Sequence, residues 1–381
     1  MKDGSNAEGA NSDRMTPREN SKTVFGPTRR EFIRGVAGAG VALAGSTLTA
    51  WADHHGHSTP NILAAALPLC AQESSPKRVR VLTLLGRPLA LVVADSHGLF
   101  AKYGVEVTTE NLPNSDVLRA NLAAGNGDLA YLAVDNAVAM VELAHQDVII
   151  VMGGEGSQNE LIAQPGIKSV KDFQSKTLIV DATNTAYALQ MKKILLLNGL
   201  QAGRDYEMKP VGATPQRLIA MRENKDYAGS MLGPPTSILA KRDGFVSLGA
   251  VQDLIGPYQA AGTFALRKWA QEHRDALTNY LAACIEAQRW LMASANKQAV
   301  VELLIKESHL APDVAGETYE SYMTRPGGYE KNAGLDLDGF KNVLKLRAEV
   351  EGQWGGHPPA PEKYYDSSYY YEALAKLKNS Q

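Results

Sequence analysis

One short segment combines the side-chain types that small-molecule sites use to orient a ligand. It supplies a carboxylate, hydroxyls, an amide and an aromatic ring around the expected start of a helix, in the order Asp181-Ala-Thr183-Asn184-Thr185-Ala-Tyr187. A few polar groups beside an aromatic ring fix the orientation of ligands in concave pockets. A simpler interpretation is that Asp181 or Thr185 only caps the helix. We treat this segment as the strongest candidate for ligand contact.

Signatures of common catalytic sites are missing from the sequence. It contains no G-x-S-x-G elbow, no P-loop and no H-E-x-x-H motif. Two cysteines, Cys70 and Cys284, are too few for a structural zinc site, an iron–sulfur cluster or a disulfide framework, and we expect Cys284 to be a buried thiol in a helix. A paired-carboxylate site formed by Asp135 and Glu155 stays open, although no other feature selects it. We therefore predict no catalytic residue, no metal ligand and no cofactor.

Composition restricts the class of protein further. The 381 residues carry 39 Lys+Arg and 41 Asp+Glu, a formal charge of −2, and 44% of them are hydrophobic. That apolar content is sufficient for a folded core. A near-neutral balance argues against a nucleic-acid binder, which needs a basic face. The length favours two domains of roughly 100–200 residues each.

From residue 78 onward, the sequence alternates strand-like and helix-like runs. Strands are expected at 79–85, 105–109, 128–134, 148–152, 177–181, 206–211 and 227–232. Helices are expected at 88–103, 116–124, 136–144, 185–198, 214–223, 266–294, 297–308 and 337–351, with a C-terminal helix whose tyrosines form a packing face. Such alternation is typical of βαβ units and a mostly parallel sheet.

The turns that follow these strands are further candidates for ligand contact, because open α/β sheets bind ligands beyond the carboxyl ends of their strands. Helix N-termini in the same place offer free N–H groups to anions. Besides the segment named above, the candidates are Gly86, Arg87, Pro88, Asp135, Asn136, Glu155, Ser157, Thr214, Met231, Gly233 and Pro234. Each has a simpler explanation, since the glycines can merely permit turns and Arg87 can be a solvated surface charge.

The N-terminal part resembles an export signal. Residues 1–27 are polar, and Thr28-Arg29-Arg30-Glu31-Phe32 then precedes an uncharged Gly/Ala-rich stretch that ends at Ala50-Trp51-Ala52. Paired arginines followed by Phe resemble a twin-arginine signal, and the stretch 35–49 is shorter than the ~20 apolar residues of a membrane span. We expect residues 1–52 to be the signal peptide and 53–77 a linker. Lipidation at Cys70 and the cleavage position stay open, and the expected location is the periplasm.

Three stretches together are similar to a known family. They are Val79 to Val107 with Gly98-Leu-Phe-Ala-Lys-Tyr-Gly104, then Asn121-Leu-Ala-Ala-Gly-Asn-Gly-Asp-Leu-Ala130, then Gly166-Ile-Lys-Ser-Val-Lys-Asp-Phe173 with the strand after it. Glu362-Lys-Tyr-Tyr-Asp366 fits the same pattern. The chain from about residue 78 to 375 resembles the nitrate/sulfonate/taurine and thiamine-pyrimidine group of periplasmic solute-binding proteins, which serve ABC importers.

This resemblance implies a fold and a role. The fold is the α/β, two-lobed periplasmic-binding-protein fold of type II, with two parallel-type sheets joined by a two-strand hinge. Lobe one would comprise residues 78–165 and 260–381, and lobe two residues 166–259, with the ligand in the cleft between them. The implied role is capture of a small molecule and its delivery, by a monomer, to an ABC permease in the inner membrane, with no enzymatic activity and no nucleic-acid partner.

The resemblance also bears on the ligand. Relatives that bind amino-sulfonates tend to carry an acidic residue before a proline after the last strand of lobe two, where this sequence has Pro234. The candidate turns hold one arginine, Arg87, against Asp135, Glu155 and Asp181. We therefore expect a neutral or singly charged organic molecule rather than taurine or sulfate. The alternatives are an exported enzyme and a ligand-sensing module on the same fold.

Overall fold

The structure is a computed structural model that describes residues 76–84 and 86–379. The expected export signal, almost all of the expected linker, and Cys70 lie outside these residues. None of the described helices is both long enough and apolar enough to cross a membrane.

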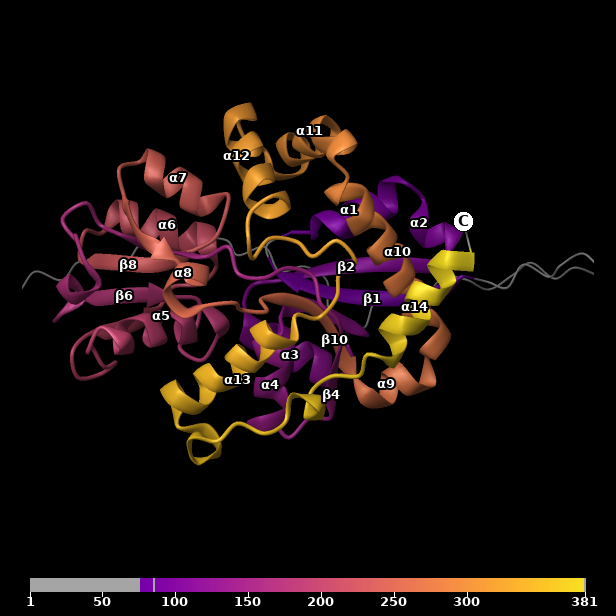
Figure 1. The fold of residues 1–381 in the computed structure, drawn as a ribbon, viewed down its shortest axis with the longest axis horizontal. Helices are drawn as coiled ribbons and strands as arrows, with labels where there is room; N and C mark the ends of the chain where they lie inside the picture. Colours follow the sequence, from indigo (N-terminus) through magenta and orange to yellow (C-terminus); the bar gives the residue numbers. More distant parts are fainter. Residues whose placement is uncertain (1–75, 85, 380–381) are drawn as a thin grey trace, which may run out of the picture. The chain divides into compact units, whose positions relative to one another are not determined.

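The first sheet has five strands in the order β2-β1-β3-β10-β4. Four of them, β1, β2, β4 and β10, are labelled in Figure 1. Its strands are β1 (Lys77–Leu84), β2 (Val105–Leu112), β3 (Leu129–Ala133), β4 (Val148–Met152) and β10 (Ala261–Leu266). Strand β1 pairs in parallel with β2 and β3, whereas β10 lies antiparallel between β3 and β4. We call the part of the chain built on this sheet the first lobe.

The second sheet also has five strands, in the order β7-β6-β8-β5-β9. They are β5 (Glu160–Ala163), β6 (Thr177–Val180), β7 (Glu207–Pro210), β8 (Tyr227–Leu232) and β9 (Val246–Ala250). Strand β6 is parallel to β7 and β8, and β5 is antiparallel to β8 and β9. We call this part the second lobe.

Both sheets are mixed, where the sequence indicated mostly parallel sheets. The antiparallel members β5 and β10 each enter a sheet directly after the chain has passed from the other lobe, without the crossover helix that a parallel connection needs. Residues 160–163, which the sequence-based boundary assigns to lobe one, pair within the second sheet. The two connections between the sheets pair at an antiparallel bridge between Gly156 and Gln259.

Helices cover the sheets on both faces. In the first lobe they are α1 (Leu89–Ser96), α2 (Leu99–Lys102), α3 (Ser115–Ala123), α4 (Asp135–Glu142), α9 (Arg267–Glu272), α10 (Arg274–Met292), α11 (Lys297–Ser308), α12 (Pro312–Met323), α13 (Leu337–Glu351) and α14 (Ser368–Asn379). The second lobe has α5 (Ala186–Leu197), α6 (Thr214–Glu223), α7 (Thr236–Arg242) and α8 (Val251–Ile255). Short 3-10 segments are η1 (Val170–Phe173), η2 (Ser294–Asn296), η3 (Gln353–Gly356) and η4 (Pro361–Lys363).

Two expected helices are divided. Gly98, whose φ of +65° is left-handed, separates α1 from α2 within the helix expected at 88–103. His273 has a φ of −122° and a ψ of 34°, which are not helical, and it separates α9 from α10 within the helix expected at 266–294.

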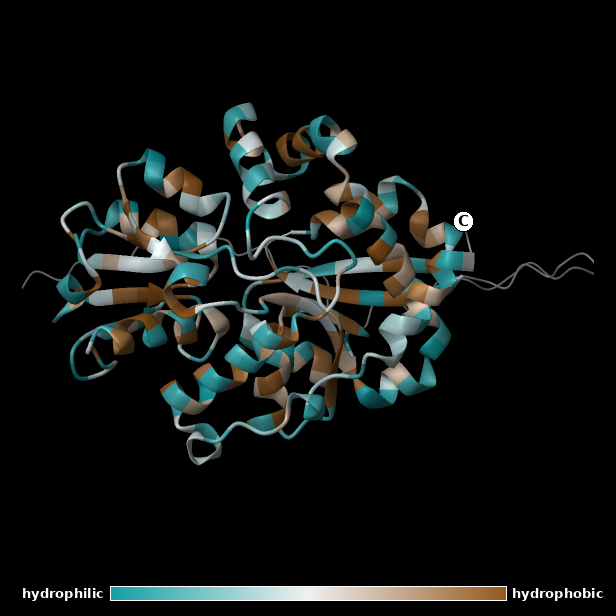
Figure 2. Ribbon diagram, viewed as in Figure 1, coloured by the Kyte–Doolittle hydropathy of each residue, from teal (hydrophilic) through white to brown (hydrophobic). Residues whose placement is uncertain are grey.

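Alternating side chains of the first sheet pack into two hydrophobic cores, one on each face of the sheet. Val79 and Val81 face the cluster that contains α1 and α10, while Leu82 and Ala130 face the cluster of α3 and α4. This follows from the two-residue period of a strand. Hydrophobic residues are concentrated on strands such as β6, while α13 alternates hydrophilic and hydrophobic turns (Figure 2). The expectation for Cys284 is confirmed: it is 2% exposed, and burial raises the pKa of its thiol to about 12.

Candidate ligand-binding cleft

A cleft of about 490 Å³ lies where turns of the two sheets converge. The first lobe contributes the β1–α1 turn, the end of β3 and the connection after β4. The second lobe contributes the first turns of α5 and α6 and the β8–α7 turn. A pocket of this size accommodates a small organic molecule.

Nine of the residues predicted from sequence line this cleft. They are Gly86, Arg87, Pro88, Glu155, Ser157, Tyr187, Thr214, Gly233 and Pro234. They come from both lobes, although they span almost 150 positions of sequence. The turns after strands of an α/β sheet therefore meet here as the strand pattern predicts.

Two candidates after β3 are not among the lining residues, because they are engaged with other side chains. Asp135 is fully buried and accepts hydrogen bonds from Arg347 Nε and Nη2 at 2.5 and 2.8 Å. Asn136 accepts one from Arg119 Nη1 at 2.9 Å. Asn184, in the second lobe, also lies outside the lining and accepts a hydrogen bond from Arg347 Nη1 at 3.3 Å. The pairing of Asp135 with Arg347 also separates it chemically from Glu155, its alternative partner in a paired-carboxylate site.

The other candidates outside the lining lie around a buried arginine or at the start of α5. Asp181 Oδ1 accepts the Thr185 hydroxyl at 2.6 Å and lies 3.9 Å from Arg217 Nη1. The Met231 carbonyl accepts Arg217 Nη2 at 3.0 Å. Thr183 is exposed beside them. Thr185 is the N-cap residue of α5, but no side chain makes a capping hydrogen bond there, so the simpler interpretation of Asp181 or Thr185 as a helix cap is not confirmed.

Arg217 is a supporting residue that the sequence analysis missed. It is fully buried, and its guanidinium donates to Ser230 Oγ at 3.0 Å, to the Gly212 carbonyl at 2.8 Å and to Thr214 Oγ1 at 3.2 Å. Its Cζ also lies 4.8 Å from the centre of the Tyr187 ring. An arginine in an amphipathic helix gives no sequence signal for such a role.

The second missed group comes from segments far along the chain. Leu304, Glu307, Ser308, Thr318, Tyr322 and Tyr329 line the cleft from α11, α12 and the segment after α12. The Tyr322 hydroxyl donates to the Pro234 carbonyl at 2.9 Å and so joins the two lobes. Helix α12 was not predicted, and nothing in its sequence pattern points to the cleft.

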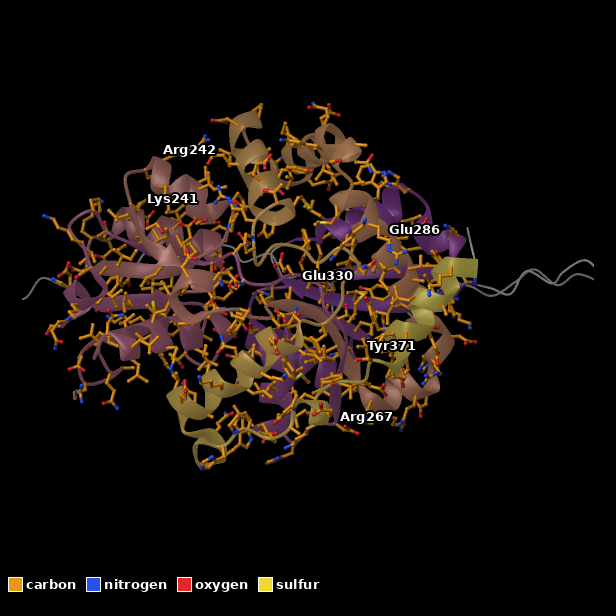
Figure 3. All side chains as sticks on the ribbon, viewed as in Figure 1. Lys241, Arg242, Arg267, Glu286, Glu330 and Tyr371 are labelled. Atoms are coloured by element: carbon orange, nitrogen blue, oxygen red, sulfur yellow. The ribbon has the colours of Figure 1, made fainter. Side chains whose placement is uncertain are left out.

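Helix α12 also contacts the second lobe outside the cleft. It lies beside α7 (Figure 1). Arg242, at the end of α7 (Figure 3), pairs with Asp313 Oδ2 at 2.5 Å and with Glu317 Oε1 at 2.6 Å. The two lobes are thus joined by exposed ion pairs beside the cleft as well as by Tyr322.

A buried amide network supports the floor of the cleft. Gln190 Nε2 donates to Ser157 Oγ at 3.3 Å, and Asn159 Nδ2 donates to Gln190 Oε1 at 2.8 Å. Gln259 Nε2 donates to the Glu155 carbonyl at 3.0 Å. These bonds fix the backbone of the inter-lobe connection that carries Glu155.

The electrostatics of the cleft are dominated by Glu155. Burial raises the pKa of its carboxyl to about 8. Burial also raises the pKa of Tyr131, Tyr187, Tyr322 and Tyr329, and the charge of nearby Glu155 adds to the rise. Four phenol rings therefore share one pocket with a carboxyl group that has no basic partner among the described residues.

The described residues hold no group of three or more His, Cys, Asp or Glu side chains placed to bind a metal ion. The cleft provides rings, hydroxyls, amides and the carboxyl groups of Glu155 and Glu307, which suit reversible binding of an organic molecule.

Comparison with known proteins places this architecture in a family. Residues 85–305, more than half of the chain, match the NMT1-like family. A relative in Brucella abortus, named only as a binding protein, is 23% identical over 284 residues, which cover 73% of this chain and 86% of the relative.

Solved structures show the same fold. The periplasmic nitrate-binding protein of Synechocystis covers 80% of this chain and 89% of its own, with a TM-score of 0.65 and 15% identity. A ligand-binding component of an ABC-type import system from Staphylococcus aureus covers 78% of this chain and 99% of its own, with a TM-score of 0.64 and 14% identity. The resemblance noted in the sequence is confirmed: the chain has the periplasmic-binding-protein fold and belongs to the NMT1-like family.

Proposed function

We propose that this protein is a periplasmic solute-binding protein that captures a small organic molecule between its lobes and delivers it to an ABC permease in the inner membrane. The observation that carries the proposal is the cleft itself, whose lining comes from both lobes and includes the inter-lobe connection. A ligand that contacts both walls favours the closed arrangement of the lobes, which a permease can distinguish from an open one. Relatives and neighbours named as binding proteins support the same role.

The remaining sequence-based predictions complete this proposal. Residues 1–52 direct export through the twin-arginine pathway, the protein acts as a monomer, and the sixteen candidate residues include its ligand contacts. Replacing both Arg29 and Arg30 by Lys should abolish export while leaving the folded part intact, which fractionation of the cells would show. Export of that variant at the normal rate would contradict the twin-arginine prediction.

The function is tested by identifying the ligand. We expect protein purified without denaturation to release a small organic molecule on unfolding, and that molecule to raise the melting temperature when it is added back. At a concentration about 100 times its dissociation constant, a ligand adds ~2.7 kcal/mol of stability. The proposal would be overturned if no molecule were released and no compound of a metabolite library shifted the melting temperature. Chemical conversion of the molecule would favour the enzyme instead.

A matched pair of variants locates the binding site. Tyr187→Ala removes a ring from the cleft, whereas Tyr371→Ala removes one that is 65% exposed and outside it. We expect the first to weaken binding by about tenfold or more and the second to have no effect. Equal affinities in both variants would contradict this placement.

A further inference from the structure

We propose that the cleft selects an organic cation, whose charged nitrogen lies against Glu155 among the rings of Tyr131, Tyr322 and Tyr329. This inference rests on the proposed function and narrows its ligand class. Four features of the described residues carry it: a carboxyl group without a partner, arginines that are already engaged, helix starts with fewer N–H donors, and a set of tyrosine rings.

The first feature is the isolation of Glu155. It lines the cleft, and no hydrogen bond or ion pair to its carboxylate exists among the described residues. A buried carboxylate without a partner is costly, whereas one that faces a bound cation is stabilised. A second acid, Glu307, lines the exposed side of the same cleft.

The second feature is that the nearby basic groups are already engaged. Arg87, the only Lys or Arg among the described lining residues, donates to Asp95 Oδ2 at 3.0 Å and to the Leu91 carbonyl. Arg217 lies behind Tyr187. Its guanidinium donates hydrogen bonds to Ser230 Oγ and to the carbonyls of Gly212 and Met231. Among the described lining residues, an anionic ligand would therefore meet only Arg87, whose guanidinium is already paired.

The third feature is the chemistry of the helix starts. Helix N-termini bind anions through free backbone N–H groups. Here, however, prolines occupy the start of three of the four helices that begin at the cleft: Pro88 before α1, Pro215 in α6, and Pro234 and Pro235 before α7. Proline has no N–H, so these starts offer fewer donors to an anion.

The fourth feature is the set of rings. Cations are attracted to the faces of aromatic rings, and such groups of rings recognise quaternary ammonium ligands. The Tyr322 and Tyr329 rings lie 5.5 Å apart, centre to centre, at an angle of 33°. The backbone of Tyr329 bridges that of Glu155, and the buried hydroxyl of Tyr131 has no hydrogen-bond partner among the described residues. Arg217 already covers one face of the Tyr187 ring, so we expect the other three rings to surround the charged nitrogen and Tyr187 to contact another part of the ligand.

The test compares probes that differ in charge but little in size. Calorimetry on the full chain would measure choline against its neutral carbon isostere 3,3-dimethylbutan-1-ol, and benzyltrimethylammonium against benzenesulfonate. We expect each cation to bind about tenfold or more tightly than its counterpart. Glu155→Gln should remove this preference, and because it replaces a carboxyl group that has no partner among the described residues by a neutral amide of similar shape, it should not unfold the protein. Glu223→Gln, which removes the same charge at an exposed position outside the cleft, should keep it.

The outcomes separate this inference from the proposed function. Equal or tighter binding of the neutral or anionic probe would overturn the cation class while leaving a working binding cleft. Failure of both cations to bind, in a protein that releases a neutral or anionic molecule on unfolding, would do the same. If no probe binds and no molecule is released, both the inference and the proposed function fail.

Discussion

Asp135 of α4 and Arg347 of α13 form an ion pair in which neither side chain is exposed to solvent, with Arg347 Nε 2.5 Å from Asp135 Oδ1. The same guanidinium reaches Asn184 of the second lobe. The pair therefore fastens α13 to the first lobe and orients the turn before α5. The sequence had placed Asp135 at the ligand, but the structure assigns it to this internal contact.

Asp135→Asn should destabilise the protein by about 3–5 kcal/mol, because it leaves a buried guanidinium charge without its partner. The free energy of unfolding in urea measures this. Replacing both residues by apolar ones, Asp135→Leu with Arg347→Met, should cost less than the single change. Arg78→Met is the control, because its pair with Glu106 is 83% and 50% exposed and should be worth at most about 1 kcal/mol. A similar cost for Asp135→Asn and the control would contradict the assignment.

Glu155 should make stability fall as pH rises. Its folded-state pKa of about 8 lies above that of an unfolded Glu, about 4.5, so the folded protein holds a proton that the unfolded chain has lost between these values. The contribution of the Glu155 carboxyl to the free energy of unfolding is fully present below about pH 4.5 and is lost as pH rises towards about 8. The groups that face Glu155 are Tyr131, Tyr187, Tyr322 and Tyr329, whose raised pKa values keep them neutral in this range.

The measurement is urea unfolding of the protein and of Glu155→Gln at about pH 5 and about pH 9. Relative to the original protein, the variant should gain up to ~4 kcal/mol between the two values. Exposed Glu307→Gln should show no such gain. A constant difference between the protein and Glu155→Gln would mean that Glu155 titrates normally.

Gly154 leaves room for Tyr131. A Cβ atom at position 154 would lie 2.7 Å from the Tyr131 hydroxyl oxygen, so Gly154→Ala must displace the ring or the backbone beside Glu155. We expect a loss of about 1–3 kcal/mol in unfolding free energy. In a Tyr131→Phe background, which lacks that oxygen, the same change should cost less. An identical cost in both backgrounds would show that the clash lies elsewhere, for example with the Ala261 carbonyl at 3.1 Å.

Removing the ion pairs between α7 and α12 should loosen the contact between the lobes without unfolding either of them. Arg242→Gln breaks the links to Asp313 and Glu317, which are exposed and therefore weak. Backbone amides of α12 should exchange hydrogen roughly two- to fivefold faster, as mass spectrometry of its peptides would show. Lys268→Gln, which removes an exposed pair within α9, is the control and should leave α12 unchanged. Unaltered exchange in Arg242→Gln would show that packing alone holds α12.

The parts of the fold that the sequence predicted are those with strong local periodicity. Strand β4 and helices α11 and α13 were predicted to the residue, because apolar spacing and flanking turn residues mark their ends. The strands β5, β9 and β10 were not predicted, since they are short and owe their place to partners far along the chain. The antiparallel direction of β5 and β10 is set by the passage between lobes, which no local pattern encodes.

The same distinction applies to the cleft. Turns after strands were identified because topology brings them to one edge of a sheet, as for Gly86 and Thr214. Tyr322 and Tyr329 were missed because their place depends on how α12 packs against α7. Asp135 was misplaced because its partner, Arg347, lies 212 positions away.

The strand orders also determine when each sheet can be completed as the chain emerges from the ribosome. The second sheet draws all its strands from one continuous stretch, 160–250, so it can assemble as soon as that stretch has emerged. The first sheet lacks its inner strand β10 until residue 266, and Ile150 of its edge strand β4 pairs with the backbone of Tyr364 and Asp366. A nascent chain halted before residue 261 would thus carry a finished second sheet beside a first sheet with unpaired edges, a state prone to aggregation. Completion of the first lobe is therefore confined to the last moments of translation or to the time after release.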